Sequence, residues 1–452
     1  MRILLVSNGY PPEAAAGVEL HTQQLAAALM DQRQTLAVFC RAGDPRAPEF
    51  QLRADRAASL PVWRVNNNFV DVADYAGYYR QPAGEALFRR VLAEWQPDVI
   101  HFQHCLGLSA GLPEIARGLG TPAVLTLHDF WYVCPTVQLR HVRGAVCPGT
   151  HHTPNCFECV RFAPAWLGRL RRTAPYRLFR AVVPERLRLS AGVGAAPAGQ
   201  PSPALTPAQR AAIQERVAVM RRALAAPHAL TAPSQFVKDT YAEFGVAPER
   251  VRVVPLGLEV ERWRSAAWQA GAPGALRLLY LGGRQPHKGI RLVLDAFRRW
   301  PGANHRLALY GVPGLDARFA AQVDADLAAD PRAAWRGSVP HAALPGVLAE
   351  ADVLLAPALW PETFSFVVRE ALLAGVWVIA SDLGVMQELI QPGRNGWLAP
   401  PGDAAAWTRA LGELAQAVAA GRRPAPAAFP ILSHTEYAAA MVELYAAARE
   451  GR

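Results

Sequence analysis

The sequence has no apolar run near the roughly 20 residues that a membrane-spanning helix requires. Its first eight residues form a short strand-like pattern, without the charged and apolar regions of a signal peptide. The sequence therefore predicts a cytoplasmic protein. At 452 residues, the chain is long enough for two or three domains, each with its own core.

Lysine is almost absent, since Lys238 and Lys288 are the only lysines among 47 basic residues. The net charge is nevertheless +10, because arginine is abundant, as a GC-rich genome would produce. Such a charge can also attract anionic substrates or an anionic membrane surface. No nucleic-acid recognition motif accompanies it, so nucleic acid is not expected as a partner.

Two common nucleotide-binding fingerprints are missing. A predicted strand at 2–8 precedes a glycine-bearing loop and a helix over 18–30, but the loop lacks Gly-x-Gly-x-x-Gly. A later strand, 277–281, leads into a loop that lacks the Gly-Lys-Ser/Thr of a P-loop. That loop nevertheless carries Arg284 and Lys288 in front of a predicted helix. Two cations before a helix N-terminus favour a phosphate site.

The stretch 353–381 predicts a strand, a loop, a helix over 366–374 and a second strand, which is a unit of a parallel α/β fold. Gly375 suits a left-handed helix end. Glu362 lies in the loop and Glu370 in the helix. Next to a helix N-terminus that suits phosphate, carboxylates favour sugar hydroxyls as ligands. The alternative is that both are solvated glutamates on a helix surface.

Polar residues follow two predicted strands in the first half of the chain. His104 comes after the strand in 97–104, and His128 and Asp129 come after the strand at 123–127. Ligands of open α/β sheets bind at such carboxyl ends, so the three are candidate site residues. A histidine at the end of a strand can also serve only as a structural hydrogen-bonding group.

Six cysteines are present, and four of them fall within 26 residues: Cys134, Cys147, Cys156 and Cys159. In a cytoplasmic protein this clustering favours a metal site over disulfides. Four thiolates suit a structural Zn²⁺, although His151 and His152 could replace sulfur ligands. The alternatives are an iron–sulfur cluster and reduced cysteines without metal.

Residues 161–190 carry eight arginines and one acid, interleaved with apolar side chains. This composition fits either an amphipathic segment on anionic lipid or a solvated basic surface over a core helix. Prolines at 164, 175 and 184 interrupt any long helix.

The stretch around Glu362 resembles the Glu–seven residues–Glu motif of the family-4 retaining glycosyltransferases, also described as glycosyl transferases group 1, which have the GT-B fold. The residues that match are Pro361, Glu362, Phe364, Glu370, Ala374, Gly375, Ile379, Ala380 and Ser381. Loop 282–289 is similar to the Gly-Arg-x-x-x-Lys-Gly element of this family, and 10–19 to its N-terminal loop. The chain departs from the pattern at Ala16, Thr363, Ser365 and Trp377.

The resemblance implies an α/β fold of the GT-B type, with two Rossmann-like domains facing across a cleft. Residues 1–227 are expected to form the acceptor-side domain, with a Cys-rich and Arg-rich insert at about 134–205. Residues 228–430 are expected to bind the nucleotide sugar, and 431–452 to form a terminal helix that crosses back to the N-terminal domain.

The resemblance also implies a reaction: retaining transfer of a sugar from a UDP- or GDP-sugar to a glycan or lipid-linked acceptor, in cell-surface polysaccharide biosynthesis. No cofactor is expected for catalysis. Contact with the inner face of the plasma membrane is expected.

The resemblance assigns roles to single residues. Arg284 and Lys288 are expected to stabilise the departing diphosphate, and Glu370 to bind the ribose. Glu362 and His128 are expected to contact the transferred sugar. The donor-binding set is completed by Gly17, Gly283, Val339, Thr363, Phe364, Ser365 and Phe366, and the acceptor-side residues are Glu19, His104 and Asp129.

Three other functions remain open at this point. A nucleotide-sugar epimerase or hydrolase of the same fold would use water instead of an acceptor. A catalytically silent partner subunit would explain the departures at Ala16, Thr363 and Ser365. A binding module built on the four cysteines would bind its ligand only with metal.

Overall fold

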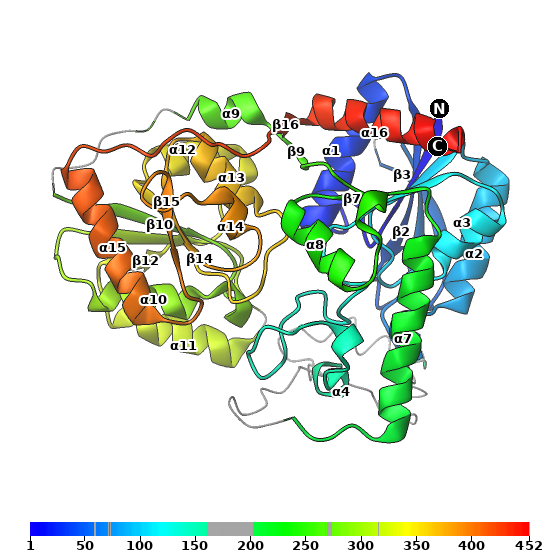
Figure 1. Ribbon diagram of the computed structural model, residues 1–452, viewed down its shortest axis with the longest axis horizontal. Coiled ribbons are helices and arrows are strands. Elements are labelled where there is room, and N and C mark those ends of the chain that lie inside the picture. Colours follow the sequence, from blue (N-terminus) through cyan, green and yellow to red (C-terminus); the bar gives the residue numbers. More distant parts are fainter. Residues whose placement is uncertain are drawn as a thin grey trace. The chain divides into compact units, whose positions relative to one another are not determined.

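The computed structural model describes residues 1–57, 60–70, 72, 74–160, 173, 175, 202–266, 268, 274–314 and 316–451. The chain divides into two compact units, Met1–Leu258 with Leu432–Arg452, and Glu259–Ile431. Both are built of a mainly parallel sheet with helices connecting its strands, as Figure 1 shows.

The first unit is built on an eight-stranded sheet with the order β3-β4-β2-β1-β5-β6-β7-β8. All neighbouring strands are parallel except β3 and β4. The central strands are continuous apolar runs because both of their faces are buried. The strands are β1 (Arg2–Ser7), β2 (Thr35–Ala42), β3 (Leu52–Ala57), β4 (Leu60–Asn66), β5 (Val99–Phe102), β6 (Ala123–Thr126), β7 (Ala229–Ala232) and β8 (Val251–Val253).

The C-terminal helix α16 (His434–Arg449) belongs to the first unit, where it packs on α1 (Gly17–Asp31). It begins with a capping box between Ser433 and Glu436. In Figure 1 the two chain ends lie close together in this unit. The other helices are α2 (Pro82–Trp95), α3 (Leu112–Gly118), α4 (Cys156–Cys159), α7 (Pro207–Ala225) and α8 (Gln235–Glu243), with short 3-10 turns η1 (Ala76–Tyr78), η2 (Thr150–His152) and η4 (Pro248–Arg250), and β16 (Leu432–Ser433) pairs with β9 (Gly257–Leu258).

The second unit has a six-stranded, fully parallel sheet with the order β12-β11-β10-β13-β14-β15. Its strands are β10 (Arg277–Leu281), β11 (Arg306–Tyr310), β12 (Ala333–Trp335), β13 (Val353–Ala356), β14 (Trp377–Ser381) and β15 (Gly396–Ala399). Its helices are α9 (Val260–Arg264), α10 (Ile290–Arg299), α11 (Ala317–Ala328), α12 (Leu344–Ala349), α13 (Phe366–Leu373), α14 (Met386–Leu389) and α15 (Ala404–Ala419), with 3-10 turns η5 (Pro286–Lys288) and η6 (His341–Ala343).

Helix α10 shows how the sequence directs packing in this unit. Its buried residues Ile290, Val293, Leu294 and Phe297 recur every three or four positions, so they share one face of the helix. This face joins the core that Trp407 of α15 also enters. The polar face of α10 carries Arg298 and Arg299 in its last turn.

The boundary predicted between residues 227 and 228 is wrong, since the units divide between Leu258 and Glu259. Strand β7 pairs with β6, and β8 pairs with β7, so both complete the first sheet. The apolar sequences of these strands predict burial but do not indicate which sheet they join.

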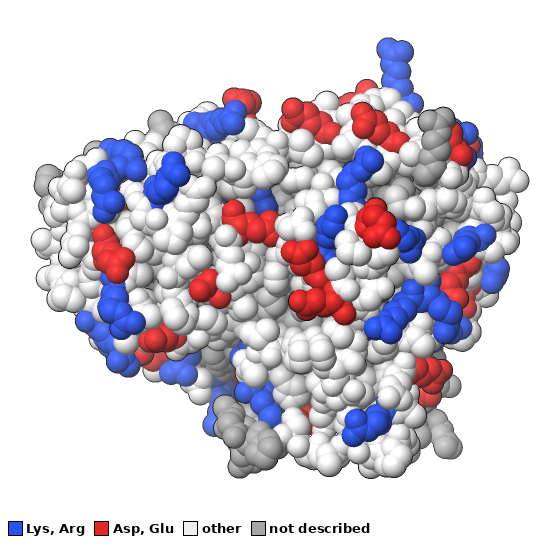
Figure 2. All heavy atoms as spheres, viewed as in Figure 1, with Lys and Arg blue, Asp and Glu red and all other residues white. Residues whose placement is uncertain are grey.

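The arginine-rich stretch 161–190, interpreted above as a lipid-facing segment or a solvated basic surface, lies outside the described residues, apart from Thr173 and Pro175. Among the helices that are described, none combines the length and apolarity needed to cross a membrane. Figure 2 shows acidic and basic side chains interspersed on the drawn face of each unit.

Candidate functional site

In the second unit, the predicted donor residues gather at the carboxyl edge of the sheet. The loops that follow neighbouring strands are hydrogen-bonded to one another here, since Gly311 N–H donates to Gly337 O (3.0 Å) and Leu359 N–H to His287 O (2.8 Å). Such an edge is where ligands of open α/β sheets bind. The loops carry the predicted residues Gly283, Arg284, Lys288, Val339 and Glu362.

Gly289 fixes the loop before α10. Its φ is +71°, and a Cβ at this position would lie 1.9 Å from the carbonyl oxygen of Pro357. Only glycine tolerates both the left-handed backbone and this close approach. The approach holds Lys288 beside the loop that follows β13.

Lys288 and Glu362 form an ion pair, with 2.8 Å between Nζ and Oε1. The Lys288 ammonium also lies 5.4 Å from the centre of the Trp360 ring. Burial acts to raise the pKa of Glu362, but the charge and hydrogen bond of Lys288 and the Ser365 hydroxyl act against it, and the pKa is lowered overall. Glu362 is therefore a carboxylate at neutral pH.

Arg284 is held by a carboxylate that the sequence did not indicate. Its Nη1 lies 2.7 Å from Oδ1 of Asp324, and its guanidinium lies 4.3 Å from the centre of the Trp335 ring. Asp324 belongs to the single Asp-x-Asp pattern of the chain, whose other member, Asp326, pairs with Arg291 at 2.6 Å. Both carboxylates of this pattern are thus neutralised by arginines.

Helix α13 begins at a residue in an unusual conformation. Ser365 is its N-cap and has φ +55° and ψ +79°, in the left-handed region. It stands at a position where glycine is usual in the resembled motif, and glycine adopts this backbone without a steric cost. Phe364 is buried, and its ring contacts that of Phe366, with centroids 4.9 Å apart. Thr363 lies between Glu362 and this aromatic pair.

Glu370 is buried within α13, with 6% of its surface exposed. Its Oε1 lies 3.7 Å from Nε2 of His341. Val339, two residues before His341, lies in the loop after β12 and is half-buried. The sequence grouped Glu370 with Glu362, but the structure gives them different neighbours, His341 for Glu370 and Lys288 for Glu362.

In the first unit, the loop after β1 leads to α1. No heavy atom lies within 4 Å of a Cβ built on Gly17, the first residue of this helix, so the space beside this residue is open. Glu19, in the first turn, is buried and accepts a hydrogen bond from Asn8 Nδ2 at 3.0 Å. The free N–H groups of the helix start are suited to an anion.

His128 lies at the end of β6 and is buried. Its Nε2 lies 2.6 Å from Oε1 of Gln103, which assigns the proton to Nε2 because an amide oxygen only accepts. Burial, followed by the charges of His21, His101 and His104, places the pKa of His128 well below 6.5. His128 is therefore neutral at physiological pH.

Gln103 connects His128 to the C-terminal helix. The Gln103 amide nitrogen lies 2.9 Å from Nδ1 of His101, and the same Nδ1 lies 2.6 Å from the hydroxyl of Tyr445 in α16. His21 of α1 packs between the rings of His128 (5.2 Å) and Tyr437 (4.9 Å). The histidine at the strand end is thus embedded in a buried polar network.

The predicted acceptor residues His104 and Asp129 contact each other. Leu106 N–H donates to His104 Nδ1 at 3.0 Å, so the ring proton is on Nε2, which lies 2.8 Å from Oδ2 of Asp129. Asp129 also accepts from the backbone N–H of Trp131, and its carbonyl accepts from the Tyr241 hydroxyl. These bonds fix the loop that carries His128.

The four clustered cysteines line one small pocket at the end of this loop. All four are free, and all but Cys147 are buried. The pocket is separate from the network around His128.

Sequence reasoning missed five residues that contact the predicted ones. Asp324 and Trp335 flank Arg284, Trp360 lies over Lys288, His341 neighbours Glu370, and Gln103 holds His128. Gln103 could have been found, because it directly follows β5 at the same sheet edge. Trp360 could have been found as well, because it precedes Glu362 by two residues in the same loop. Asp324, Trp335 and His341 come from other elements and carry no local signal.

Comparison with protein-family models gives two matches. The model of "Glycosyl transferases group 1" matches residues 275–417. The model of "Glycosyltransferase Family 4" matches residues 15–183 and 203–262, more than half of the chain.

Among curated proteins, the chain is 32% identical over 165 residues to the phosphatidyl-myo-inositol mannosyltransferase of Mycobacterium leprae, covering 35% of this chain and 42% of that protein. It is 29% identical over 184 residues to the amylovoran biosynthesis glycosyltransferase AmsK of Erwinia amylovora, covering 38% and 44%. The chain thus spans about two fifths of the length of these curated relatives.

Among solved structures, the sucrose-phosphate synthase of Thermosynechococcus elongatus has a TM-score of 0.61 at 17% identity, covering 98% of both chains. HepE of Anabaena, in complex with UDP, has a TM-score of 0.59 at 15% identity, covering 99% of this chain and 100% of that one. At such identities the likeness shows the fold alone, which is GT-B.

Proposed function

Because the chain belongs to the glycosyl transferases of group 1 and family 4, we propose that it transfers a sugar, with retention of anomeric configuration, from a nucleotide sugar to a glycan or lipid-linked acceptor. The Lys288–Glu362 ion pair carries this proposal. It places a cation for phosphate and a carboxylate for sugar hydroxyls side by side, at the sheet edge where a ligand is expected.

Binding of a donor would separate Lys288 from Glu362 and give each of them a new partner on the donor. A diphosphate carries more charge than one carboxylate, so Lys288 would bind it in place of Glu362. Arg284 would likewise leave Asp324, whose side chain is 61% exposed and can be solvated. The released Glu362 carboxylate would then accept hydrogen bonds from the hydroxyls of the sugar. Gly283, Thr363, Phe364, Ser365 and Phe366 lie on the same loops and complete the proposed donor site.

To accelerate transfer, the protein must stabilise the negative charge that develops on the departing diphosphate. Arg284 and Lys288 stabilise that charge, and the helix N-termini at Gly17 and Phe366 add backbone N–H donors. The acceptor hydroxyl attacks the anomeric carbon from the face that the diphosphate leaves, and a phosphate oxygen takes its proton. His128 contacts the transferred sugar as a neutral imidazole. We propose no catalytic metal for this reaction.

The comparisons support the substrate classes of this proposal. The Anabaena relative in fold was solved with UDP and with UDP-glucose, which supports a nucleotide-sugar donor. The mannosyltransferase and amylovoran relatives act in glycolipid and polysaccharide biosynthesis by their names, which supports a lipid-linked or glycan acceptor at the membrane. We propose UDP or GDP as the carrier, with the base near Val339. His104, Asp129 and Glu19 are proposed to face the acceptor.

Glu370 is proposed to bind the ribose hydroxyls, and its substitution tests the nucleotide site. Hydrogen bonds to a charged group are worth about 1.5–3 kcal/mol, so Glu370→Ala is expected to weaken nucleoside diphosphate binding roughly 10- to 150-fold. Isothermal titration calorimetry with UDP and GDP measures this loss. The exposed Glu413 of α15 supplies the control Glu413→Ala, which should bind like the wild type.

Equal affinity of Glu370→Ala and wild type would rule out the ribose assignment. The activity itself is tested by incubating the protein with UDP- and GDP-sugars and lipid-linked acceptors, and by determining the anomeric configuration of the product by NMR. An inverted product would contradict the retaining mechanism. Sugar release without acceptor would indicate a hydrolase or epimerase, and failure to bind any nucleotide would indicate a silent subunit.

A further inference from the structure

Three separate pieces of the first unit converge on one pocket. Cys134 lies in the turn after β6, where its N–H donates to Phe130 O. Cys147 ends a short hairpin that is closed by the bridge between Arg140 and Val146. Cys156 and Cys159 are the first and last residues of α4. The four side chains line the same pocket, with His141 at its edge.

The pocket has a volume of about 10 Å³, which is room for a single atom of the size of a water molecule or less. Besides the four cysteines, the lining consists of Val133, Pro135 and Pro154 together with Arg140, His141 and Thr150. A single metal ion with sulfur ligands fits this size and this lining.

Hydrogen-bond donors already point at the sulfurs. The backbone N–H of Val142 donates to Sγ of Cys159 at 3.4 Å, and the hydroxyl of Thr136 lies 3.3 Å from Sγ of Cys134. The backbone at Gly149 forms a hydrogen bond to Cys147. Donors of this kind stabilise the negative charge of metal-bound thiolates and orient them.

A buried positive charge lies next to the cysteines. Arg216 of α7 is 1% exposed, and among the described residues its side chain contacts backbone carbonyl groups and the Tyr79 ring, and no carboxylate. Its guanidinium donates to the carbonyl oxygens of Trp131 and Tyr132 instead. These two carbonyl groups immediately precede Val133 and Cys134, so the guanidinium lies beside the segment that carries the first cysteine.

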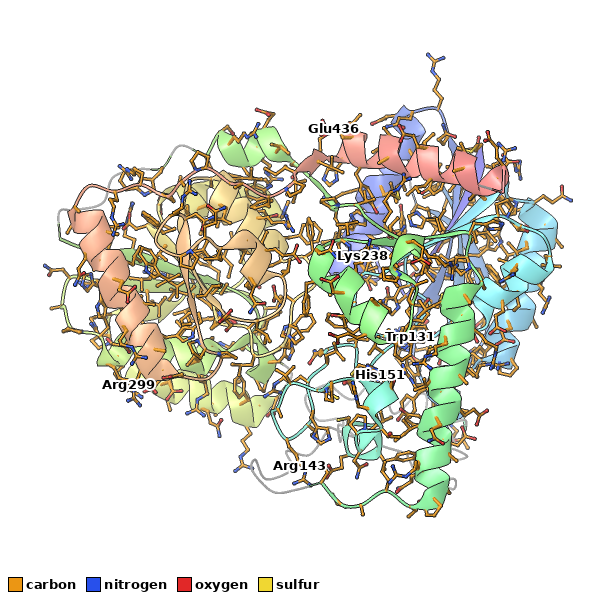
Figure 3. The ribbon with its side chains drawn as sticks, viewed as in Figure 1. Trp131, Arg143, His151, Lys238, Arg299 and Glu436 are labelled. Atoms are coloured by element: carbon orange, nitrogen blue, oxygen red, sulfur yellow. The ribbon has the colours of Figure 1, made fainter. Side chains whose placement is uncertain are left out.

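A buried cation without a counter-ion is costly, and a nearby anion removes that cost. Four thiolates around one Zn²⁺ carry a net charge of minus two by formal count. A zinc–thiolate centre would therefore supply the anion that Arg216 lacks among the residues that the structure describes. In Figure 3, Trp131 and His151 lie near α7, while Arg143 of the hairpin lies further from it, so the segment spans from α7 outward.

We propose that Cys134, Cys147, Cys156 and Cys159 bind one structural zinc ion, which holds residues 130–160 together and against α7. As described, no three histidine, cysteine or acidic side chains stand close enough to share an ion. Zinc binding therefore includes rotation of the thiol side chains into the pocket they line, at a Zn–S distance of about 2.3 Å. The centre is structural because all four positions are taken by protein ligands.

The metal content of the purified full-length chain tests this proposal. Inductively coupled plasma mass spectrometry is expected to find about one zinc per chain. The double substitution Cys156→Ser with Cys159→Ser is expected to remove it. Cys40→Ala, which alters a buried cysteine of β2 outside the pocket, is expected to keep it.

Folding failure of the double variant is covered by a second measurement. Titrating the wild-type chain with a mercurial reagent in the presence of a zinc-sensitive dye should release zinc as the thiols react, and thermal stability should fall with it. Cys159→His should keep the metal, because histidine replaces a thiolate in many zinc sites. Protein expressed in a medium that contains cobalt in place of zinc should show a thiolate-to-cobalt charge-transfer absorption.

Four outcomes would overturn the proposal. They are wild-type protein without zinc or cobalt absorption, full zinc content in the double variant, iron with the absorption of a cluster, and thiol titration showing the four cysteines paired as disulfides. None of these readouts depends on transferase activity, so failure of the zinc proposal is distinguishable from failure of the proposed reaction.

Discussion

The ammonium of Lys288 lies 2.8 Å from Oε1 of Glu362, so the residue proposed for the diphosphate of the donor and the residue proposed for its sugar neutralise each other. The pair is partly exposed, with 31% of the Lys288 side chain and 13% of the Glu362 side chain accessible. Its net contribution to the free energy of unfolding is therefore small, about 1 kcal/mol or less. A diphosphate that binds Lys288 must first displace this carboxylate.

Glu362→Gln is therefore expected to tighten the binding of nucleoside diphosphate while it stops transfer. The Glu362 carboxylate competes with the diphosphate for Lys288. Removing an interaction of up to about 1 kcal/mol between the two side chains corresponds to a gain of up to roughly fivefold in nucleotide affinity. Calorimetry with UDP and GDP measures the affinity, and a coupled assay measures turnover. Lys288→Met is the opposing variant and should weaken binding. Weaker nucleotide binding by Glu362→Gln than by the wild type would contradict the proposal that the diphosphate displaces Glu362 from Lys288.

The same ion pair predicts a dependence of stability on pH. The pKa of Glu362 is lowered in the folded chain, so its contribution is present above the unfolded value of about 4.3 and is lost as pH falls through the folded pKa. Thermal unfolding of wild type and Glu362→Gln should therefore differ at pH 7, and the difference should shrink as the pH falls below about 4. A constant difference between the two proteins across this range would contradict the pairing.

The left-handed backbone at Ser365 leads us to expect that a substitution within the candidate site stabilises the folded chain. Its φ of +55° costs a non-glycine residue roughly 1–2 kcal/mol, and glycine avoids this cost but has a more flexible unfolded chain. We expect Ser365→Gly to raise the free energy of unfolding by about 0.5–1 kcal/mol. Chemical denaturation measures the change.

Two further variants separate backbone strain from the hydroxyl. Ser365→Ala keeps the strain and loses the hydroxyl that lowers the pKa of Glu362, so it should not stabilise the chain. Gln96→Gly, at the end of α2 with φ +48°, should stabilise by a similar amount without any effect on donor binding. Destabilisation by Ser365→Gly would show that the hydroxyl outweighs the strain.

The sequence predicted the local strands, helices and loops that carry the candidate residues. Short buried strands, glycines at helix ends and the loops between them are properties of neighbouring residues, so the positions of Lys288, Glu362 and Ser365 followed from the chain. The pairing of Arg284 with Asp324 spans forty residues, and nothing in either neighbourhood indicates it. The domain boundary failed for the same reason, because the choice of sheet partner for β7 is a tertiary event.

The bond between His128 and Gln103 makes a prediction about catalysis. Because burial and neighbouring histidines keep the pKa of His128 well below 6.5, wild-type activity should show no step from this residue between pH 6 and 8. Gln103→Glu replaces a neutral acceptor, 2.6 Å from Nε2, with a carboxylate that favours the protonated imidazole. The variant should therefore gain a step in the pH–rate profile, with activity changing as His128 loses its proton.

The matched variants decide whether Gln103 acts through His128. Gln103→Leu leaves a buried N–H donor without its acceptor, which costs about 1–3 kcal/mol of stability and should lower kcat without adding a step to the pH profile. Tyr445→Phe removes the hydroxyl that contacts His101, and it should have a smaller effect of the same kind, because His101 lies one bond further from His128. An unchanged pH profile in Gln103→Glu would mean that His128 does not titrate in response to its partner, and Gln103 would then be a purely structural residue.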